Sequence, residues 1–74
     1  MKLYLISQSE NNDYDTYDSA VVCAPNEATA RSITPGYGFG SSWCSSPQAV
    51  KVEFIGDASC DVKEGVVLAS FNAG

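Results

Sequence analysis

The sequence predicts a small α+β domain: a mostly antiparallel four-stranded sheet with one short helix on one face. Two observations support this class. Four short runs rich in strand-forming residues are spread along the 74 residues, and one helix-like segment lies between the second and third runs. The predicted order is strand, strand, helix, strand, strand. Residues 1–74 are expected to form one domain, because a chain of this length has room for one core.

The first two strands are predicted at Lys2–Ser7 and Ser19–Ala24. In the second run, Ala20, Val22 and Ala24 fall on one face of the strand, since side chains alternate along extended backbone. The polar residues between the two runs indicate a long hairpin loop or an extended ribbon. The two strands are therefore expected to be antiparallel neighbours.

A short helix is predicted after Pro25, which ends the second strand. Asn26 is a good N-cap, because its side-chain oxygen can accept a hydrogen bond from a backbone amide of the first turn. Glu27 follows, where the helix dipole favours a negative charge. The helix is expected to continue to about Ile33 and to end at Thr34-Pro35-Gly36, because proline restricts the preceding residue and glycine permits a turn.

The last two strands are predicted at Ala49–Ile55 and Gly65–Phe71, after a loop rich in glycine and serine at Gly36–Gln48. Apolar residues lie on both faces of the last strand, which indicates that the second face of the sheet is also covered, by another subunit. A homo-oligomer is expected for a second reason: a core this small contributes little net stability by itself.

Charge and cysteine content exclude several classes of function. The net charge is −5, and the four cations, Lys2, Arg31, Lys51 and Lys63, are too scattered to bind duplex nucleic acid. The acidity either supports solubility alone or suits a basic groove on another protein. Cysteines are odd in number, with no Cys-x-x-Cys pair and no histidine, so no zinc site is expected.

Neither a metal nor a cofactor is expected elsewhere in the chain. Asn11, Asp13 and Asp15 alternate as in a calcium loop, but an EF-hand would need glycine at Thr16 and glutamate at Val22. The segment 36–40 matches no phosphate-binding fingerprint. Without histidine, and with no activating partner visible for a cysteine, the chain is predicted not to be an enzyme. It has no signal segment and no apolar run long enough to span a membrane, which favours a cytoplasmic location.

Aromatic and acidic side chains are the best candidates for binding. If the loop before the second strand and the 36–48 loop lie at one end of the sheet, their aromatic residues would form a cleft for a base or a peptide side chain. Trp43 could equally fill the core. Arg31 could pair with a phosphate, or simply complement the helix dipole. The predicted ligand-binding residues are Tyr14, Asp15, Tyr17, Asp18, Arg31, Tyr37 and Trp43.

Three segments, Tyr4–Gln8, Tyr14–Val22 and Val66–Gly74, resemble a family of short, uncharacterised proteins from phages and prophages. The resemblance covers most of the chain except the Gly/Ser-rich loop, and it implies a phage accessory protein in the host cytoplasm that counters host defence. The leading hypothesis is sequestration of a small nucleotide-type immune signal in an oligomeric pocket. The alternatives are an acidic inhibitor of a host defence protein complex, of the anti-CRISPR type, and a phage assembly component.

Overall fold

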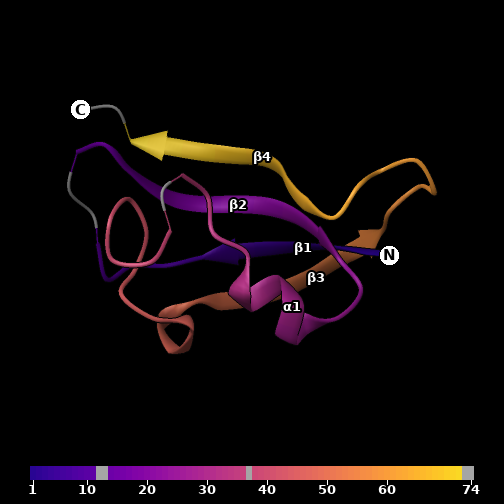
Figure 1. The fold of residues 1–74 in the computed structure, drawn as a ribbon, viewed down its shortest axis with the longest axis horizontal. Coiled ribbons are helices and arrows are strands. Elements are labelled where there is room, and N and C mark those ends of the chain that lie inside the picture. Colours follow the sequence, from indigo (N-terminus) through magenta and orange to yellow (C-terminus); the bar gives the residue numbers. More distant parts are fainter. Residues whose placement is uncertain (12–13, 37, 73–74) are drawn as a thin grey trace.

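The computed structural model describes residues 1–11, 14–36 and 38–72 and shows a four-stranded antiparallel sheet with one short helix (Figure 1). The predicted fold class is confirmed. The strands follow the spatial order β3-β1-β2-β4, so β3 and β4 form the two edges. The elements are β1 (Lys2–Ser7), β2 (Thr16–Ala24), α1 (Glu27–Ser32), the 3₁₀ turn η1 (Pro47–Ala49), β3 (Lys51–Asp57) and β4 (Gly65–Asn72).

All three strand pairs are antiparallel, and β1 and β2 are neighbours as predicted. Their register sets Tyr4 opposite Val22 and Ile6 opposite Ala20. Because cross-strand partners project to the same face, these four side chains lie together. All of them are buried, so this face of the sheet forms one wall of the core.

The helix and the 36–50 segment cover this face of the sheet (Figure 1). Ala30 of α1 joins the core cluster, and so do Trp43, Cys44 and Val50 from the segment that follows the helix. Trp43 is fully buried and is the largest buried side chain. The long loop therefore supplies much of the apolar contact that a helix of six residues cannot provide.

The capping prediction for α1 is confirmed. The Asn26 side chain accepts a hydrogen bond from the Thr29 amide at 2.8 Å, and Glu27 lies in the first turn. At the other end, Pro35 is fully buried and Gly36 has a φ of 69°. A Cβ on Gly36 would lie 2.7 Å from Cε2 of Tyr17 and still closer to the Ser42 hydroxyl, so glycine is required for close approach as well as for the turn.

Two predicted boundaries were wrong. β2 begins at Thr16, three residues before the predicted start, because Thr16 and Tyr17 pair with Asn72 and Phe71 of β4. A polar, aspartate-containing segment carries no strand pattern by itself, so only the neighbouring strand reveals it. The other correction concerns Ala49, which ends the 3₁₀ turn η1; β3 starts at Lys51 and continues to Asp57.

Among the described residues, no helix lies over the opposite face of the sheet. Leu5 and Val21 are half-buried there, and Leu68 is 69% exposed. The β3–β4 connection covers only the end of this face, where the Cys23 Sγ lies 3.7 Å from the Met1 Sδ and 3.8 Å from the Val62 carbonyl. The sequence predicted that another subunit covers this face, and with one copy of the chain that stays a prediction.

Candidate binding surface

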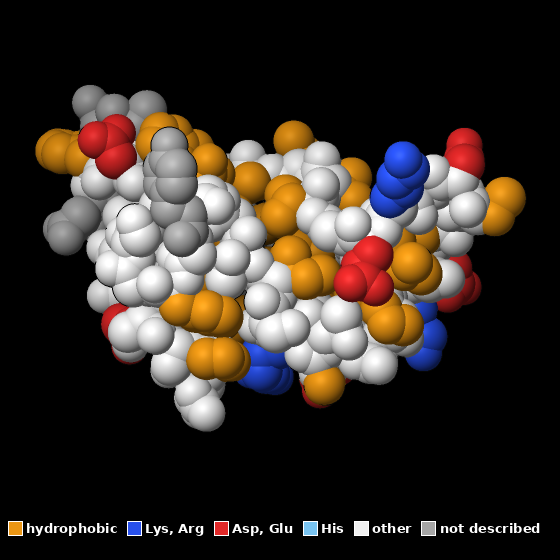
Figure 2. All heavy atoms as spheres, viewed as in Figure 1, with side chains coloured by type: hydrophobic (Ala, Val, Ile, Leu, Met, Phe, Trp, Pro, Cys, Tyr) orange, Lys and Arg blue, Asp and Glu red, His pale blue; other side chains and the backbone are white. Residues whose placement is uncertain are grey.

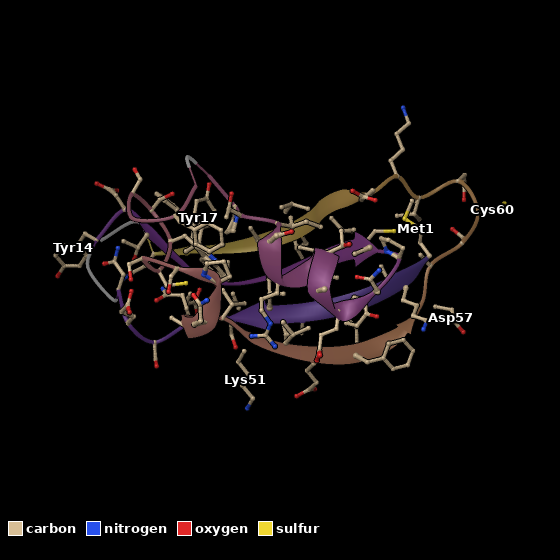
Figure 3. The ribbon with its side chains drawn as sticks, turned by 60° about the horizontal axis from the view of Figure 1, so that its bottom comes forward. Met1, Tyr14, Tyr17, Lys51, Asp57 and Cys60 are labelled. Atoms are coloured by element: carbon tan, nitrogen blue, oxygen red, sulfur yellow. The ribbon has the colours of Figure 1, made fainter. Side chains whose placement is uncertain are left out.

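An exposed turn at residues 14 and 15 leads into β2. Tyr14 is 74% exposed, and its side chain points away from one end of the molecule (Figure 3). Asp15 has a φ of 63°, a left-handed conformation that aspartate adopts more readily than most residues. Its amide donates a hydrogen bond to the Asn72 carbonyl at 2.6 Å. The turn is therefore fastened to the last residue of β4.

A tilted aromatic pair lies beside this turn. The ring centroids of Tyr17 and Phe71 are 4.8 Å apart, and the Tyr17 amide donates to the Ser42 carbonyl at 2.8 Å. Tyr17 packs against the core, whereas Phe71 is 47% exposed. Tyr17 thus anchors the pair, and Phe71 presents apolar surface. We call the exposed residues of this end, Tyr14, Asp15, Asp18 and Phe71, the tip.

Gln8 organises the start of the loop that leads to the tip. Its buried amide nitrogen donates to the carbonyls of Asn11 and Tyr17, at 2.7 and 2.8 Å, and its oxygen accepts from the Asn11 amide at 2.7 Å. The Asn11 side chain reaches the carbonyls of Ser41 and Trp43, each at 3.4 Å. The two loops predicted to meet at one end of the sheet are therefore joined by hydrogen bonds.

Glu10 also connects the two loops and adds negative charge to this end of the sheet. Its carboxylate accepts a hydrogen bond from the Ser45 amide at 2.6 Å. Hydrogen bonding from Ser45 lowers the pKa of Glu10 below its ordinary value of 4.5, because it stabilises the ionised form. With Asp15 and Asp18, both exposed, three carboxylates lie at the end of the sheet that carries the tip.

The cations lie elsewhere. Lys51 is opposite Ser7, at the same end of the sheet as the tip but on the β3 edge, with β1 and β2 between it and β4. Lys2 is at the far end, opposite Ala24. Lys63 precedes β4 at that same far end. Figure 2 shows acidic and apolar side chains at the end where β4 finishes, with lysine and arginine side chains nearer the middle and the opposite end. The tip is therefore a locally acidic surface.

Arg31, predicted as a ligand residue, makes an internal contact. Its guanidinium donates to the Val50 carbonyl, which links α1 to the residue before β3. The side chain is half-buried and belongs to α1, and Figure 3 shows this helix away from Tyr14. The sequence hypothesis supplied Arg31 to the pocket from a neighbouring subunit, and with one copy of the chain this stays a prediction.

Trp43 occupies the core and presents no surface to a ligand, so the core alternative for this residue is confirmed. Its indole Nε1 is buried and has no hydrogen-bond partner among the described residues. Tyr37 lies outside the residues that the structure describes. Of the predicted set, Tyr14, Asp15 and Asp18 are exposed together at one end, and Tyr17 supports them from inside.

Several residues that build this surface escaped sequence analysis. Gln8, Glu10 and Asn11 hold the loops together, and Phe71 provides the exposed aromatic ring. A polar residue in a loop gives no periodic signal, and the partners of Glu10 and Asn11 in the other loop are 30 or more positions away. Phe71 had a signal, since it ends an apolar strand next to the C-terminus, but its partner Tyr17 was assigned to a loop.

The three cysteines are free thiols. Cys23 and Cys44 are buried, and Cys60 is exposed in the β3–β4 connection. Burial raises the pKa of the Cys44 thiol above its ordinary value of 9.0, because desolvation disfavours the thiolate. Cys23 is buried as the sequence predicted, in contact with the Met1 thioether.

A shallow groove crosses the uncovered face of the sheet beside β4. Side chains of β1, β2 and β4 line it, including Leu5, Val21 and Leu68, with Ser19 and Ser70 at its polar end. The groove lies next to an edge strand with exposed aliphatic residues, Val66, Val67 and Leu68. This edge is a second exposed feature, separate from the carboxylates of the tip.

The described residues contain no cluster of His, Cys, Asp or Glu that could hold a metal ion. Within the same residues, no helix has the length and apolar character required to cross a membrane.

Comparison with known proteins adds no relative. No protein-family model matches the chain, and neither a curated protein nor a solved structure matches it. The class that the fold defines is a small α+β protein with a four-stranded antiparallel sheet.

Proposed function

We propose that this protein acts by stoichiometric binding, without turnover, and that the tip contacts a basic surface on a partner protein. The observation that carries the proposal is the exposed Tyr14, 74% accessible, beside the carboxylates of Asp15 and Asp18. Tyrosine is enriched at protein interfaces because it buries a large ring with little loss of side-chain freedom. Carboxylates around it favour a partner rich in lysine and arginine.

The preformed backbone of the tip supports this proposal. The amides of Asp15 and Tyr17 are hydrogen-bonded to the Asn72 and Ser42 carbonyls, and the Gln8 side chain is bonded to the carbonyls of Asn11 and Tyr17. A binding surface that is already ordered loses less conformational entropy when it meets a partner. The tip therefore needs little rearrangement to bind.

The negative charge of the tip favours a protein partner over a nucleotide ligand. A nucleotide-type signal carries phosphates, and the carboxylates of Glu10, Asp15 and Asp18 would repel it. Within one chain, Arg31 is bonded to the Val50 carbonyl and Trp43 is inside the core, so neither supplies the tip with a cation or a stacking ring. Sequestration of a nucleotide remains a second proposal, and it requires a cation from another copy of the chain.

The biological setting is also part of the proposal. The resemblance to phage and prophage accessory proteins suggests that the partner is a component of a host defence complex in the host cytoplasm. An acidic surface of this kind would act by covering a basic groove that the complex needs for its own ligand. The protein would then be an inhibitor that works in proportion to its concentration.

The experiment is a quantitative affinity purification from bacterial host cells with three forms of the protein: wild type, a tip variant and a charge-matched control. The tip variant is Asp15→Lys with Asp18→Lys. The control, Asp57→Lys with Glu64→Lys, makes the same charge change among exposed residues at the other end of the sheet. Circular dichroism checks that all three forms are folded.

We expect a protein partner that the wild type and the control retain and the tip variant loses, with binding that weakens as salt rises. Equal loss in both variants would mean that net charge alone, and no defined surface, governs binding, and the proposal would fail. Native mass spectrometry of the same wild-type sample gives a second criterion. A bound mass of a few hundred daltons, without a protein partner, would favour nucleotide sequestration instead.

A further inference from the structure

The two edges of the sheet differ in how they resist pairing with another chain. β3 carries Lys51, Glu53 and Asp57, and its register against β1 shifts between Leu3 and Tyr4. Charges and bulges are the features by which natural edge strands avoid unwanted pairing. β4 reads Gly-Val-Val-Leu-Ala-Ser-Phe-Asn and has neither a charge nor a proline. Its register against β2 also shifts, between Tyr17 and Ser19 and between Val21 and Val22. The two edges therefore differ in charge, and β4 is the edge that no charged side chain protects.

The side chains of β4 are exposed on both faces. Val67 is 51% exposed, Leu68 69% and Phe71 47%. Long, apolar and uncharged edge strands are templates for pairing, because their outward amides and carbonyls have no partner within the sheet. Figure 1 shows β4 alone along its side of the molecule, with β2 as its neighbour and neither the helix nor the 36–50 segment beyond it.

The backbone direction of β4 follows from one hydrogen bond. The Asn72 carbonyl accepts from the Asp15 amide, so the backbone groups of Asn72 face β2. Along a strand these groups alternate in direction, so those of Ala69 and Phe71 face the open edge. A chain that added to this edge would bond to these two residues.

We propose that β4 pairs antiparallel with β4 of a second copy of this chain, which gives a continuous eight-stranded sheet. The pairing is isologous, around a two-fold axis perpendicular to the sheet. Rotation about this axis leaves each face of the sheet on its own side. A residue of β4 therefore pairs, across the seam between the two copies, with a residue whose side chain projects to the same face. Because the backbone groups of Ala69 face the open edge, we place the two-fold axis at this residue. Ala69 then lies opposite Ala69 of the second copy, and Leu68 lies opposite Ser70 of the second copy.

Charge favours the antiparallel orientation over the parallel one. Antiparallel pairing brings the end of β4, with Asp15 beside it, next to the start of β4 in the partner, where Lys63 and Glu64, of opposite charge, precede the strand. A parallel pairing would instead bring the two acidic tips together. The strand itself contributes no charge at the seam, so like charges do not meet when it pairs with itself.

The area indicates a dimer in equilibrium with monomer. Eight residues at about 3.4 Å each, on a sheet about 10 Å thick, give a contact strip of about 270 Å² per copy. The total, about 540 Å², is below the roughly 1,200 Å² of stable interfaces, so the dimer should dissociate on dilution. The groove lined by Leu5, Val21 and Leu68 adjoins the strip, and pairing would extend it across the seam.

Sedimentation equilibrium over a wide concentration range tests the proposal with two matched variants. Leu68→Lys puts a charge on the β4 edge, and Ile55→Lys makes the same change on the β3 edge, where Ile55 is 46% exposed. We expect the wild type and Ile55→Lys to approach twice 7.8 kDa at high concentration. Leu68→Lys should associate at least about tenfold more weakly. A wild type that stays monomeric, or equal weakening by both variants, would overturn the proposal.

A cysteine cross-link tests the register and does not depend on the lysine variants. In a Cys60→Ser background, which removes the exposed thiol, Ala69→Cys sets two thiols opposite each other at the two-fold axis. Hydrogen-bonded antiparallel partners have Cα atoms about 5.5 Å apart, within the range of a disulfide. Under mild oxidation with oxidised glutathione, we expect a linked dimer for Ala69→Cys and none for Glu53→Cys on β3. No link at position 69, or equal linking at both positions, would refute the register.

This dimer is independent of what the tip binds. The two tips would lie at opposite ends of the seam, so each dimer would present two of them. Loss of the dimer with the tip's binding intact would refute the strand pairing alone. Loss of the tip's binding with an intact dimer would refute the proposed function alone.

Discussion

Gly36→Ala tests how the loop that supports the tip is built. Two costs add at this position. A non-glycine residue at a φ of 69° costs about 1–3 kcal/mol, because the Cβ meets the backbone. The new Cβ would also lie 2.7 Å from Cε2 of Tyr17 and closer still to the Ser42 hydroxyl. Overpacking of this kind costs about 1–3 kcal/mol, so the expected loss is about 2–6 kcal/mol.

The same loop supplies a matched control. Gly40 has a φ of 82°, but a Cβ there would have nothing within 4 Å. Gly40→Ala should therefore lose only the conformational part, about 1–3 kcal/mol. The difference between the two variants isolates the contact with Tyr17 and Ser42.

Urea denaturation measures both variants, followed by fluorescence of the single tryptophan, Trp43, which is fully buried in the folded state. At about 0.05–0.15 kcal/mol per residue, the 74-residue chain has about 4–11 kcal/mol of stability, so Gly36→Ala would be close to unfolding. Equal losses for Gly36→Ala and Gly40→Ala would refute the reasoning, because the contact with Tyr17 would then carry no energy.

Three further predictions concern the core, the helix contact and pH. Trp43→Ala should lower the free energy of unfolding by about 3–5 kcal/mol, because it leaves a cavity under the 36–50 segment. The urea midpoint, followed by circular dichroism, measures this loss, and a loss below about 1 kcal/mol would contradict the place of Trp43 in the core. Arg31→Ala should cost about 1.5–3 kcal/mol through the lost bond to the Val50 carbonyl, and unchanged stability would show that this bond is unimportant. Glu10 has a lowered pKa in the folded state, so its contribution is present above pH 4.5 and is lost as pH falls through the lower, folded value. Urea midpoints between about pH 3 and 6 should fall less steeply for Glu10→Gln than for wild type, and equal slopes would exclude the Ser45 contact as the cause.

Local patterns were sufficient for most of the fold. Short runs rich in strand-forming residues, in Lys2–Ser7 and in the second half of β2, predict strands. Asn26 predicts the start of α1, because a cap acts within four residues of itself. These features depend on neighbours in sequence, and the structure confirms them.

The candidate site was predicted only in part. Exposed tyrosine and aspartate residues between two strands marked Tyr14, Asp15 and Asp18 correctly as surface. Arg31 and Trp43 were grouped with them because their chemistry suited a ligand, yet one is bonded to Val50 and the other fills the core. Chemical type alone does not say whether a side chain faces solvent or another part of the chain.

By itself, the sequence determined the class of fold, the helix cap and the acidic character of the segment before β2. The tertiary structure decided that Thr16 and Tyr17 are strand residues, that Asn11 joins two loops, and that β4 is an uncharged edge. The physical reason is the distance along the chain between partners: Tyr17 pairs with Phe71, and Glu10 bonds to Ser45. Such contacts leave no periodic pattern in either segment, because the two partners come into contact only when the chain folds.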